Sequence, residues 1–182
     1  MSKVLWHTQM SLDGFIAGPN DDMRWAFEAE SGGPDETIDE VLERVGALLV
    51  GRRTQDVEDR EQQGFYGGAY NGPFFVLRHD PPEQPPVVKG VTGVVLDVSI
   101  GEAIERALSA AGGKDVVILG ANIAKQCLAA GLLNEIIIHL TPILLGGGVR
   151  LFDQPDGRPV KLKRTFVAER GQLTALGFEV ID

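Results

Sequence analysis

The chain has almost none of the residues that build disulfide frameworks or zinc sites, and no segment suited to a membrane anchor. Its 182 residues include one cysteine, Cys127, and three histidines, His7, His79 and His139. One cysteine excludes an internal disulfide framework, and so few Cys and His residues predict no metal site. No apolar run approaches the length of a bilayer, and Lys3 is followed directly by a strand-like pattern. We therefore expect no signal peptide, no membrane contact and a cytoplasmic location.

Positive charge is also scarce. The sequence has 17 Lys and Arg residues against 26 Asp and Glu residues, a formal net charge of -9 at pH 7. A protein that tracks nucleic acid needs a basic surface, so nucleic acid is excluded as the expected partner. Any anionic ligand has to be held by a local group of side chains and backbone. The length fits one domain with a sizeable core, and we predict a single domain over residues 1–182.

Apolar strand-like segments alternate with amphipathic helical segments, the pattern of an α/β sheet. The expected strands cover residues 4–12, 47–51, 74–78, 92–98, 116–119, 134–145, 162–169 and 172–180, and the expected helices cover 37–46, 100–111 and 121–131. The last two strands follow each other directly, which predicts an antiparallel end to a mostly parallel sheet. Irregular segments at 13–35 and 55–72 complete the prediction, because long loops in compact domains often carry function.

Two helix starts have the spacing of a capping box, in which a hydroxyl and a carboxylate satisfy free backbone N–H groups reciprocally. They pair Thr37 with Glu40 and Ser99 with Glu102. We expect these residues to begin the helices, with no part in function.

Glycine marks the most informative turn. Residues 116–119 form a short apolar strand, Gly120 follows, and the next segment has helical spacing with Ile123 and Cys127 on one face. Free N–H groups at such a helix start, with the helix dipole, are suited to a pyrophosphate. A glycine at this turn is equally compatible with steric reasons alone, because short glycine motifs are permissive.

Basic residues follow two other apolar strands. Gly51, Arg52, Arg53 and Thr54 come directly after residues 47–50, and Arg78 follows the strand at 74–77. Arginine pairs well with phosphate oxygens, although arginines that leave a strand are often simply solvated. Ligands of open α/β sheets collect at the carboxyl ends of strands, so these clusters predict one shared crevice.

The order of these motifs resembles a known family across nearly the whole chain. The segments are SLDGFIAG, LLVGRRT, FVLR and VVILGANIAKQCLAAGLLNEIIIHLTPILLGGGVRLF. They resemble the dihydrofolate reductase-like reductases related to the C-terminal domain of the bifunctional riboflavin-biosynthesis deaminase-reductase. The resemblance implies an α/β fold with a mixed, mostly parallel sheet of about eight strands flanked by helices, NADPH as hydride donor, and a homodimer.

The same resemblance implies roles for particular residues. Ala17 would line the nicotinamide side, and Arg78 would meet the adenosine 2′-phosphate and so favour NADPH over NADH. Family members often have two glycines where this chain has Leu119 and Gly120. The phosphate-binding residues implied are Gly51, Arg52, Arg53 and Thr54, with Gly120, Ala121, Asn122 and Ile123 under the pyrophosphate.

The acidic residue of the SLDG motif, Asp13, is the candidate catalytic residue, implied to orient the substrate or relay a proton. An Asp before Gly is also an ordinary turn residue. Dihydrofolate reductases proper use a carboxylate on the first helix. Here counting forward from Trp25 gives Glu30 and counting back from Gly51 gives Asp35, a disagreement that argues against true dihydrofolate reduction.

Two further features are left with alternative interpretations. The aromatic residues Trp25, Phe65 and Tyr66 lie in the two long loops and either stack on a heterocyclic substrate or cover the core edge. Residues 146–148 are glycines that predict a tight turn or bulge, and Arg150 beyond them either binds a substrate phosphate or makes a surface contact.

The resemblance favours a stand-alone NADPH-dependent oxidoreductase. A deaminase half needs a zinc site with paired cysteines, which one cysteine excludes. The expected substrate is a pyrimidine- or pterin-like heterocycle, and the reference reaction is 5-amino-6-(5-phosphoribosylamino)uracil reduction in riboflavin biosynthesis. The alternative is a non-catalytic nucleotide-binding protein that uses this fold for sensing or dimer stabilisation. A Rossmann dehydrogenase is disfavoured, because residues 13–18 lack the G-x-G-x-x-G fingerprint.

Overall fold

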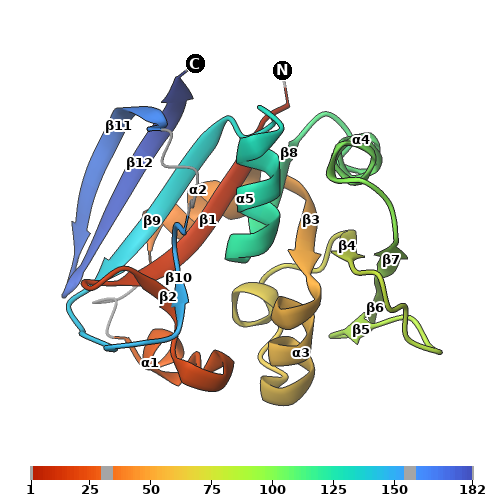
Figure 1. Cartoon of the computed structure of the whole chain (residues 1–182), viewed down its shortest axis with the longest axis horizontal. Coiled ribbons are helices and arrows are strands. Elements are labelled where there is room, and N and C mark those ends of the chain that lie inside the picture. The colour runs from red at the N-terminus through yellow and green to blue at the C-terminus, as the bar shows by residue number, and fades with distance from the viewer. Residues whose placement is uncertain (1, 30–34, 154–158, 182) are drawn as a thin grey trace.

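The computed structural model describes residues 2–29, 35–153 and 159–181, and its centre is an eight-stranded sheet (Figure 1). The strand order is β11-β12-β9-β1-β8-β3-β4-β7. The strands from β9 to β7 in that order run parallel, β12 is antiparallel to β9, and β11 is antiparallel to β12. The bounds are β1 Val4–Ser11, β3 Val45–Gly51, β4 Phe74–Leu77, β7 Val94–Leu96, β8 Asp115–Leu119, β9 Glu135–Thr141, β11 Lys161–Arg170 and β12 Leu173–Ile181.

Smaller elements complete the molecule. Two short antiparallel pairs lie outside the main sheet: β2 Phe15–Ala17 with β10 Val149–Arg150, and β5 Val87–Val88 with β6 Val91–Thr92. The helices are α1 Arg24–Phe27, α2 Glu36–Arg44, α3 Arg52–Glu61, α4 Ile100–Ala110 and α5 Ala121–Ala129, with single helical turns at Pro19–Asp21 and Phe65–Gly68. None of the helices within the described ranges is long and apolar enough to cross a membrane.

The predicted α/β class and the antiparallel end of the sheet are confirmed, but two helices were missed, the four-residue α1 and the longer α3. Helix α3 begins within the GRRT cluster and occupies much of the segment expected to be irregular. Its sequence, RRTQDVEDRE, has a single large apolar residue and buries only Gln55, so it lacks the apolar stripe that identifies helices in a sequence. Strand β9 ends at Thr141, four residues earlier than expected, because Pro142 has no N–H to continue the ladder.

One of the two predicted caps is wrong. Helix α2 is capped by Asp35, whose Oδ1 accepts the N–H groups of Thr37 at 2.9 Å and Ile38 at 3.2 Å. The predicted cap, Thr37, therefore lies inside the first turn. The hydroxyl half of the other is confirmed, since the Ser99 hydroxyl accepts the N–H of Glu102 at 3.3 Å at the start of α4, whereas the Glu102 carboxylate pairs with Arg106.

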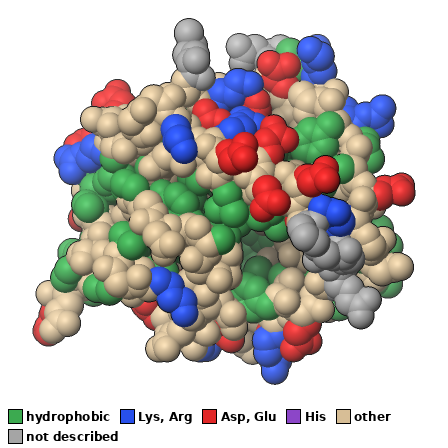
Figure 2. Space-filling view, turned by 180° about the vertical axis from the view of Figure 1, so that it is seen from behind, with side chains coloured by type: hydrophobic (Ala, Val, Ile, Leu, Met, Phe, Trp, Pro, Cys, Tyr) green, Lys and Arg blue, Asp and Glu red, His purple; other side chains and the backbone are tan. Residues whose placement is uncertain are grey.

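Alternating residues of the strands feed two cores on opposite faces of the sheet. Trp6 and Ile118 pack with α4 and α5 on one face, whereas Leu5 and Val117 pack with Val41 of α2 on the other. In Figure 1, α5 lies in front of the sheet and α2 behind it. Figure 2 views the molecule from behind and shows charged side chains of both signs around a hollow lined by hydrophobic side chains.

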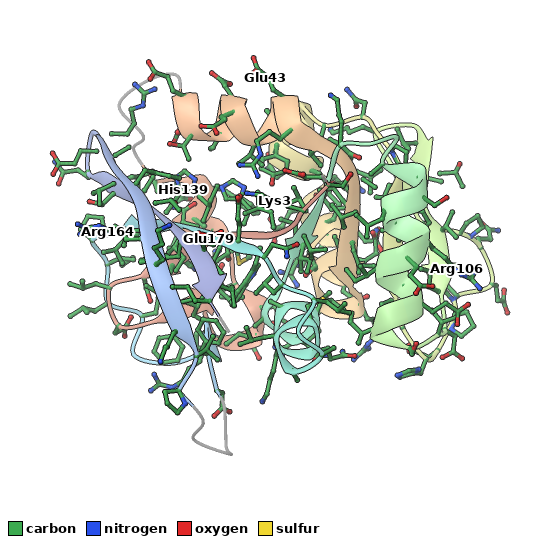
Figure 3. All side chains as sticks on the ribbon, turned by 90° about the horizontal axis from the view of Figure 1, so that it is seen from above. Lys3, Glu43, Arg106, His139, Arg164 and Glu179 are labelled. Atoms are coloured by element: carbon green, nitrogen blue, oxygen red, sulfur yellow. The ribbon has the colours of Figure 1, made fainter. Side chains whose placement is uncertain are left out.

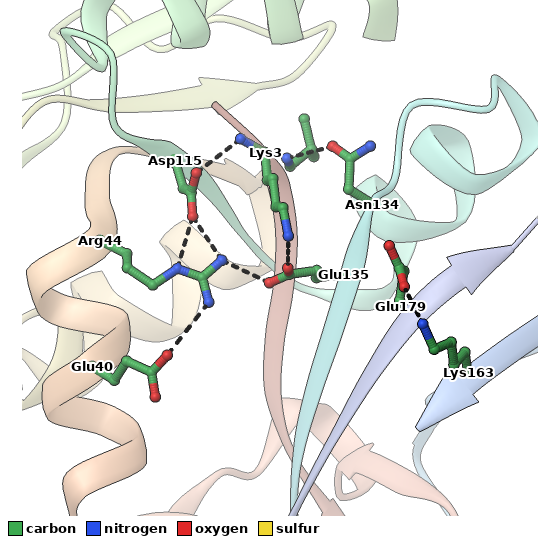
Figure 4. A network of polar contacts seen from close by, with 9 residues as sticks. Lys3, Glu40, Arg44, Asp115, Asn134, Glu135, Lys163 and Glu179 are labelled. Carbon is green, nitrogen blue, oxygen red and sulfur yellow. Dashed lines mark hydrogen bonds and ion pairs between the residues drawn. The ribbon is translucent and has the colours of Figure 1, made fainter. Parts of the chain in front are cut away.

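The amino ends of the central strands are held by an ion-pair network (Figure 4). Arg44, the last residue of α2, donates to Asp115 Oδ2 at 2.7 Å and to Glu135 Oε2 at 2.6 Å, and Lys3 pairs with Glu135. These carboxylates begin β8 and β9. Because the network occupies the amino edge, it anchors the scaffold and leaves the carboxyl edge of the sheet for a ligand.

Candidate active site

A crevice of about 680 Å³ lies at the carboxyl edge of the parallel strands. Its walls come from β2 and the segment after it, from Arg53 of α3, from the start of α5, and from residues 148–153. The structure thus brings together three clusters that are far apart in the sequence. This is the edge at which open α/β sheets bind ligands.

Two helices start at this crevice without a side-chain cap, unlike α2 and α4. Helix α3 follows Gly51 and helix α5 follows Gly120, and neither glycine offers a capping group. Their first N–H groups have no partner among the described side chains at the cap. Free helix starts bind phosphate groups through these N–H donors and the helix dipole. Since β3 and β8 are neighbouring strands, both starts lie at one place.

Gly120 keeps the two helix starts close together. Its φ is 100°, and a Cβ added there would lie 2.6 Å from Thr54 Oγ1. The Thr54 hydroxyl in turn lies 3.5 Å from the Leu119 carbonyl oxygen. Gly51 makes a similar but looser approach, since an added Cβ would lie 3.4 Å from Cγ1 of Ile123. Gly120 is therefore needed for close packing as well as for the turn, whereas Gly51 has an extended backbone with φ -90° that any residue adopts.

The predicted arginines are present but are already paired. Arg53 donates through Nε to Asp21 Oδ2 at 3.0 Å, and Asp21 lies in the segment that follows β2. Arg78, at the end of β4, pairs with Asp80 at 3.2 Å, and the pKa of Asp80 is lowered by Arg78 and also by Arg52. Arg52 and Arg78 thus lie close enough to act on one exposed carboxylate. An anionic ligand that paired with Arg53 or Arg78 would compete with these acidic partners.

Asp13 lies at the end of β1 as a hydrogen-bond hub. Its Oδ1 accepts the Ser11 hydroxyl at 2.6 Å and the N–H of Leu145 at 3.1 Å, and its Oδ2 accepts the N–H of Gly146 at 2.7 Å. The Ser11 hydroxyl and these N–H groups lower the pKa of Asp13 to about 2. Asp13 is therefore a carboxylate at neutral pH. It holds the glycine loop after β9 and has no proton to give.

Two predicted cofactor residues, Ile123 and Ala17, do not line the crevice. The Ile123 side chain is buried in the α5 core, and Ala17 is 8% exposed within β2. A Cβ added at Gly148 would lie 2.0 Å from the Ala17 carbonyl oxygen, so the glycine run lets β10 cross β2 closely. This observation explains Gly148 as a packing glycine, in agreement with the predicted bulge.

The crevice also contains cations outside the predicted set. Lys125, one turn into α5, lines it, and so does Arg150, whose guanidinium lies 4.8 Å from the Phe15 ring centroid. Helical spacing places Lys125 one turn beyond Ala121, so the sequence held a signal for it. The stacking of Arg150 on Phe15 depends on the β2–β10 pairing and had no local signal.

The three aromatic residues of the long loops make different contacts. Phe65 is buried against Phe74 in the core on the α2 face, with ring centroids 5.2 Å apart. Trp25 donates its indole N–H to the Asp22 carbonyl at 3.1 Å. Tyr66 is directed inward onto His7. Of the two candidate carboxylates, Asp35 lies beside His139, whereas Glu30 lies outside the described residues.

The sheet order and the glycine-lined crevice define a dihydrofolate reductase-like reductase domain. The chain belongs to the RibD C-terminal domain family, whose model matches residues 2–175. This family is a reductase family whose members generally bind a nicotinamide cofactor. The resemblance stated from the motifs is thereby confirmed. No curated protein sequence matches the chain.

Solved structures agree with this family. A protein of Shewanella sp. PV-4 described as a riboflavin biosynthesis protein is 25% identical, with a TM-score of 0.83 and 99% of each chain covered. The deaminase/5-amino-6-(5-phosphoribosylamino)uracil reductase of Thermotoga maritima is 16% identical, with a TM-score of 0.71, covering 99% of this chain and 57% of its own. The riboflavin biosynthesis reductase Rib7 of Saccharomyces cerevisiae is 16% identical, with a TM-score of 0.61, covering 99% of this chain and 90% of its own.

Proposed function

We propose that the protein is an NADPH-dependent reductase of a pyrimidine- or pterin-like heterocycle, acting as a homodimer in the cytoplasm. The observation that carries the proposal is the pair of uncapped helix starts, joined by the contact between Gly120 and Thr54, beside a crevice large enough for a nucleotide. In this proposal Gly51, Arg52, Arg53 and Thr54 face one phosphate region, and the turn from Gly120 to Ile123 faces the pyrophosphate.

Bound NADPH would supply a hydride from its nicotinamide ring. The chain has to orient the ring, exclude water and direct a proton to the substrate atom that gains electrons. Backbone at Ala17 would border the ring, because β2 and β10 form the crevice wall beside it. Asp13 acts as a positioning residue or hydrogen-bond acceptor, since its low pKa excludes proton donation at neutral pH.

Cofactor choice is tested at Arg78. Titration with NADPH and NADH, followed by nicotinamide fluorescence, should show tighter binding of NADPH. Arg78→Ala should weaken NADPH binding about tenfold and leave NADH nearly unchanged, because a 2′-phosphate contact is lost. Arg106→Ala, which removes an exposed arginine paired with Glu102 on α4, is the matched control and should change neither value. Absence of binding by both nucleotides would overturn the cofactor assignment.

Asp13→Asn separates an enzyme from a non-catalytic nucleotide-binding protein. The amide keeps one acceptor for the glycine loop but loses the negative charge that faces the substrate region. We expect NADPH binding to persist while the turnover of a 5-amino-6-ribosylaminouracil phosphate substrate, or of a related heterocycle, falls at least tenfold. If the wild-type protein binds NADPH but reduces no member of a pyrimidine and pterin panel, the non-catalytic alternative stands.

A further inference from the structure

A continuous chain of polar side chains crosses the core on the α2 face. The Tyr66 hydroxyl lies 2.8 Å from His7 Nδ1, His7 Nε2 lies 2.8 Å from His139 Nε2, and His139 Nδ1 lies 3.5 Å from Asp35 Oδ2. The four residues come from the turn at 65–68, from β1, from β9 and from the cap of α2. Both imidazoles are at least 95% shielded from solvent. Buried polar groups assembled from four segments carry a strict hydrogen-bonding requirement.

Two arrangements of protons satisfy the two hydrogen bonds among Tyr66, His7 and His139 with neutral imidazoles, and the Asp35 carboxylate favours one of them. A carboxylate only accepts and repels a lone pair that faces it, so Asp35 favours the form of His139 that carries its proton on Nδ1. Its Nε2 then accepts from His7 Nε2–H. His7 Nδ1 is left to accept the Tyr66 O–H. Burial lowers the pKa of His7 and of His139, which keeps both rings neutral, and it raises the pKa of Tyr66, which keeps its proton.

The Asp35 end of the chain opens into a small cavity. Its volume is about 110 Å³, and its walls come from α2, from His139 and from the β11–β12 hairpin. The 3.5 Å separation of His139 and Asp35 exceeds a normal hydrogen bond, so donor and acceptor both retain capacity for a ligand. The cavity is well below the roughly 300 to 1,000 Å³ of drug-sized pockets, and suits a single ring.

The backbone at Tyr66 indicates that its position is imposed. Tyr66 has φ 56° and ψ 41°, left-handed values that cost a bulky residue roughly 1 to 3 kcal/mol. Gly64 and Gly67 beside it also have positive φ. The loop therefore accepts strain at the residue whose hydroxyl ends the chain.

The cavity lies at the same edge of the sheet as the crevice. His139 pairs in register with Gln9, two residues before Ser11 and Thr141 end β1 and β9. Figure 3 shows His139 on the side of the sheet that α2 covers, whereas α5 with its phosphate turn lies on the other side. The cofactor crevice and the His139 cavity thus approach the carboxyl edge from opposite faces.

We propose that His139 and Asp35 recognise the lactam edge of the heterocyclic substrate, where a ring N–H adjoins a C=O group. The ring C=O would accept the His139 Nδ1–H, and the ring N–H would donate to Asp35 Oδ2. His7 and Tyr66 are positioning residues, because they fix the tautomer of His139. This inference rests on the proposed reductase function and names the groups that read its substrate.

The first experiment measures the tautomers by long-range ¹H–¹⁵N NMR of the histidine side chains. His139 should carry its proton on Nδ1 and His7 on Nε2. Tyr66→Phe should mix the tautomers of both rings, because His7 Nδ1 loses its donor. The matched control is Tyr70→Phe, which removes a buried hydroxyl that donates to Pro73 O at 2.8 Å. This hydroxyl makes no hydrogen bond to His7 or His139. Nε2 protonation of His139 in the wild type would overturn the proposal.

The second experiment titrates the protein with uracil and with 1,3-dimethyluracil, which lacks both ring N–H groups. Uracil should shift the signals of His139 and of the Thr37 and Ile38 amides beside Asp35, and dimethyluracil should bind at least tenfold more weakly. Equal binding of both compounds, or shifts elsewhere only, would overturn the lactam assignment.

Two variants of His7 test whether uracil binding depends on the hydrogen-bonded side chains behind His139. His7→Leu should weaken uracil at least fivefold, and His7→Gln, whose amide N–H replaces Nε2–H, should restore much of the binding. NADPH titration of each variant and of the wild type distinguishes a failure of the His139 proposal from a failure of the proposed reductase function. Retained NADPH binding with unaltered uracil binding contradicts the His139 proposal alone, whereas no NADPH binding by the wild type contradicts the proposed function.

Discussion

The two polar regions at the carboxyl edge of the sheet use opposite physical strategies. The crevice near α5 is open, and it offers backbone N–H groups and exposed cations such as Lys125 and Arg150. The region near α2 has His7 and His139 buried and oriented by their neighbours, with the Asp35 carboxylate at the end that opens into its cavity. Exposed cations attract any anion, whereas a buried donor beside an acceptor discriminates between ring edges. In the proposed function, the crevice binds the charged cofactor and the α2 side recognises the substrate ring.

Gly120→Ala should have the largest effect of these variants, because it alters the turn proposed to bind the cofactor at the crevice. The new Cβ would lie 2.6 Å from Thr54 Oγ1 on a backbone with φ 100°, so the turn has to shift. We expect NADPH affinity to fall at least tenfold, and the free energy of unfolding to fall by roughly 1 to 3 kcal/mol. Fluorescence titration and urea unfolding measure the two effects.

Gly101→Ala provides the control for Gly120→Ala. Gly101 lies inside α4, and nothing lies within 4 Å of an added Cβ. Alanine there should leave NADPH binding unchanged and raise stability by up to about 1 kcal/mol. Equal NADPH affinity in Gly120→Ala and the wild type would contradict the phosphate-turn assignment.

Lowering the pH should reduce the free energy of unfolding through the buried histidines on the α2 side of the sheet. Burial lowers the folded-state pKa of His7 and His139, so below about pH 6.5 the unfolded chain binds protons that the folded chain refuses. Stability should therefore be full above that pH and fall below it, by at most about 1.4 kcal/mol per pH unit for each histidine. Asp35 opposes the loss at His139 by favouring its charged form, while Tyr66 faces His7 without charge.

Urea unfolding at pH 7.5 and pH 5.5 checks this sign. His79→Gln is the control, because His79 is exposed and pairs with Asp97 outside the core, so its loss should leave the decline between these pH values nearly intact. A double variant, His7→Leu with His139→Leu, should flatten the curve. Unchanged pH dependence in that variant would show that other groups set the acid sensitivity.

Lys125→Gln should have the smallest effect. It tests whether salt weakens NADPH binding at the crevice more than uracil binding on the α2 side. Lys125 is exposed at the crevice, so its contribution to NADPH binding should be less than fivefold at 0.15 M salt and should shrink further at 1 M salt. Lys163→Gln on β11, where Lys163 pairs with Glu179, is the control and should not alter binding. Uracil binding on the α2 side should depend little on salt in both variants, because uracil carries no net charge, and a strong dependence would contradict recognition by hydrogen bonds.

Local patterns in the sequence were sufficient for much of the fold. Strands β3, β4 and β8 are continuous apolar runs, and each ends directly in its glycine or arginine cluster, so their place at one sheet edge followed from parallel topology. Helix α3 escaped prediction because almost all of its residues are polar, and the cap of α2 was misplaced because Asp35 competed with Thr37 for the same role.

The sequence by itself determined three features: the glycine turns, the arginines that follow strands, and the order of motifs along the chain that resembles the family. Only the tertiary structure decided that His7 and His139, 132 residues apart, share a hydrogen bond, and that Tyr66 and Asp35 end their chain. The physical reason is that a glycine turn acts through its own backbone, which local sequence encodes. A buried hydrogen-bond chain exists only where the packing of β1 against β9 places side chains from distant segments within 3 Å, and no local pattern carries that register.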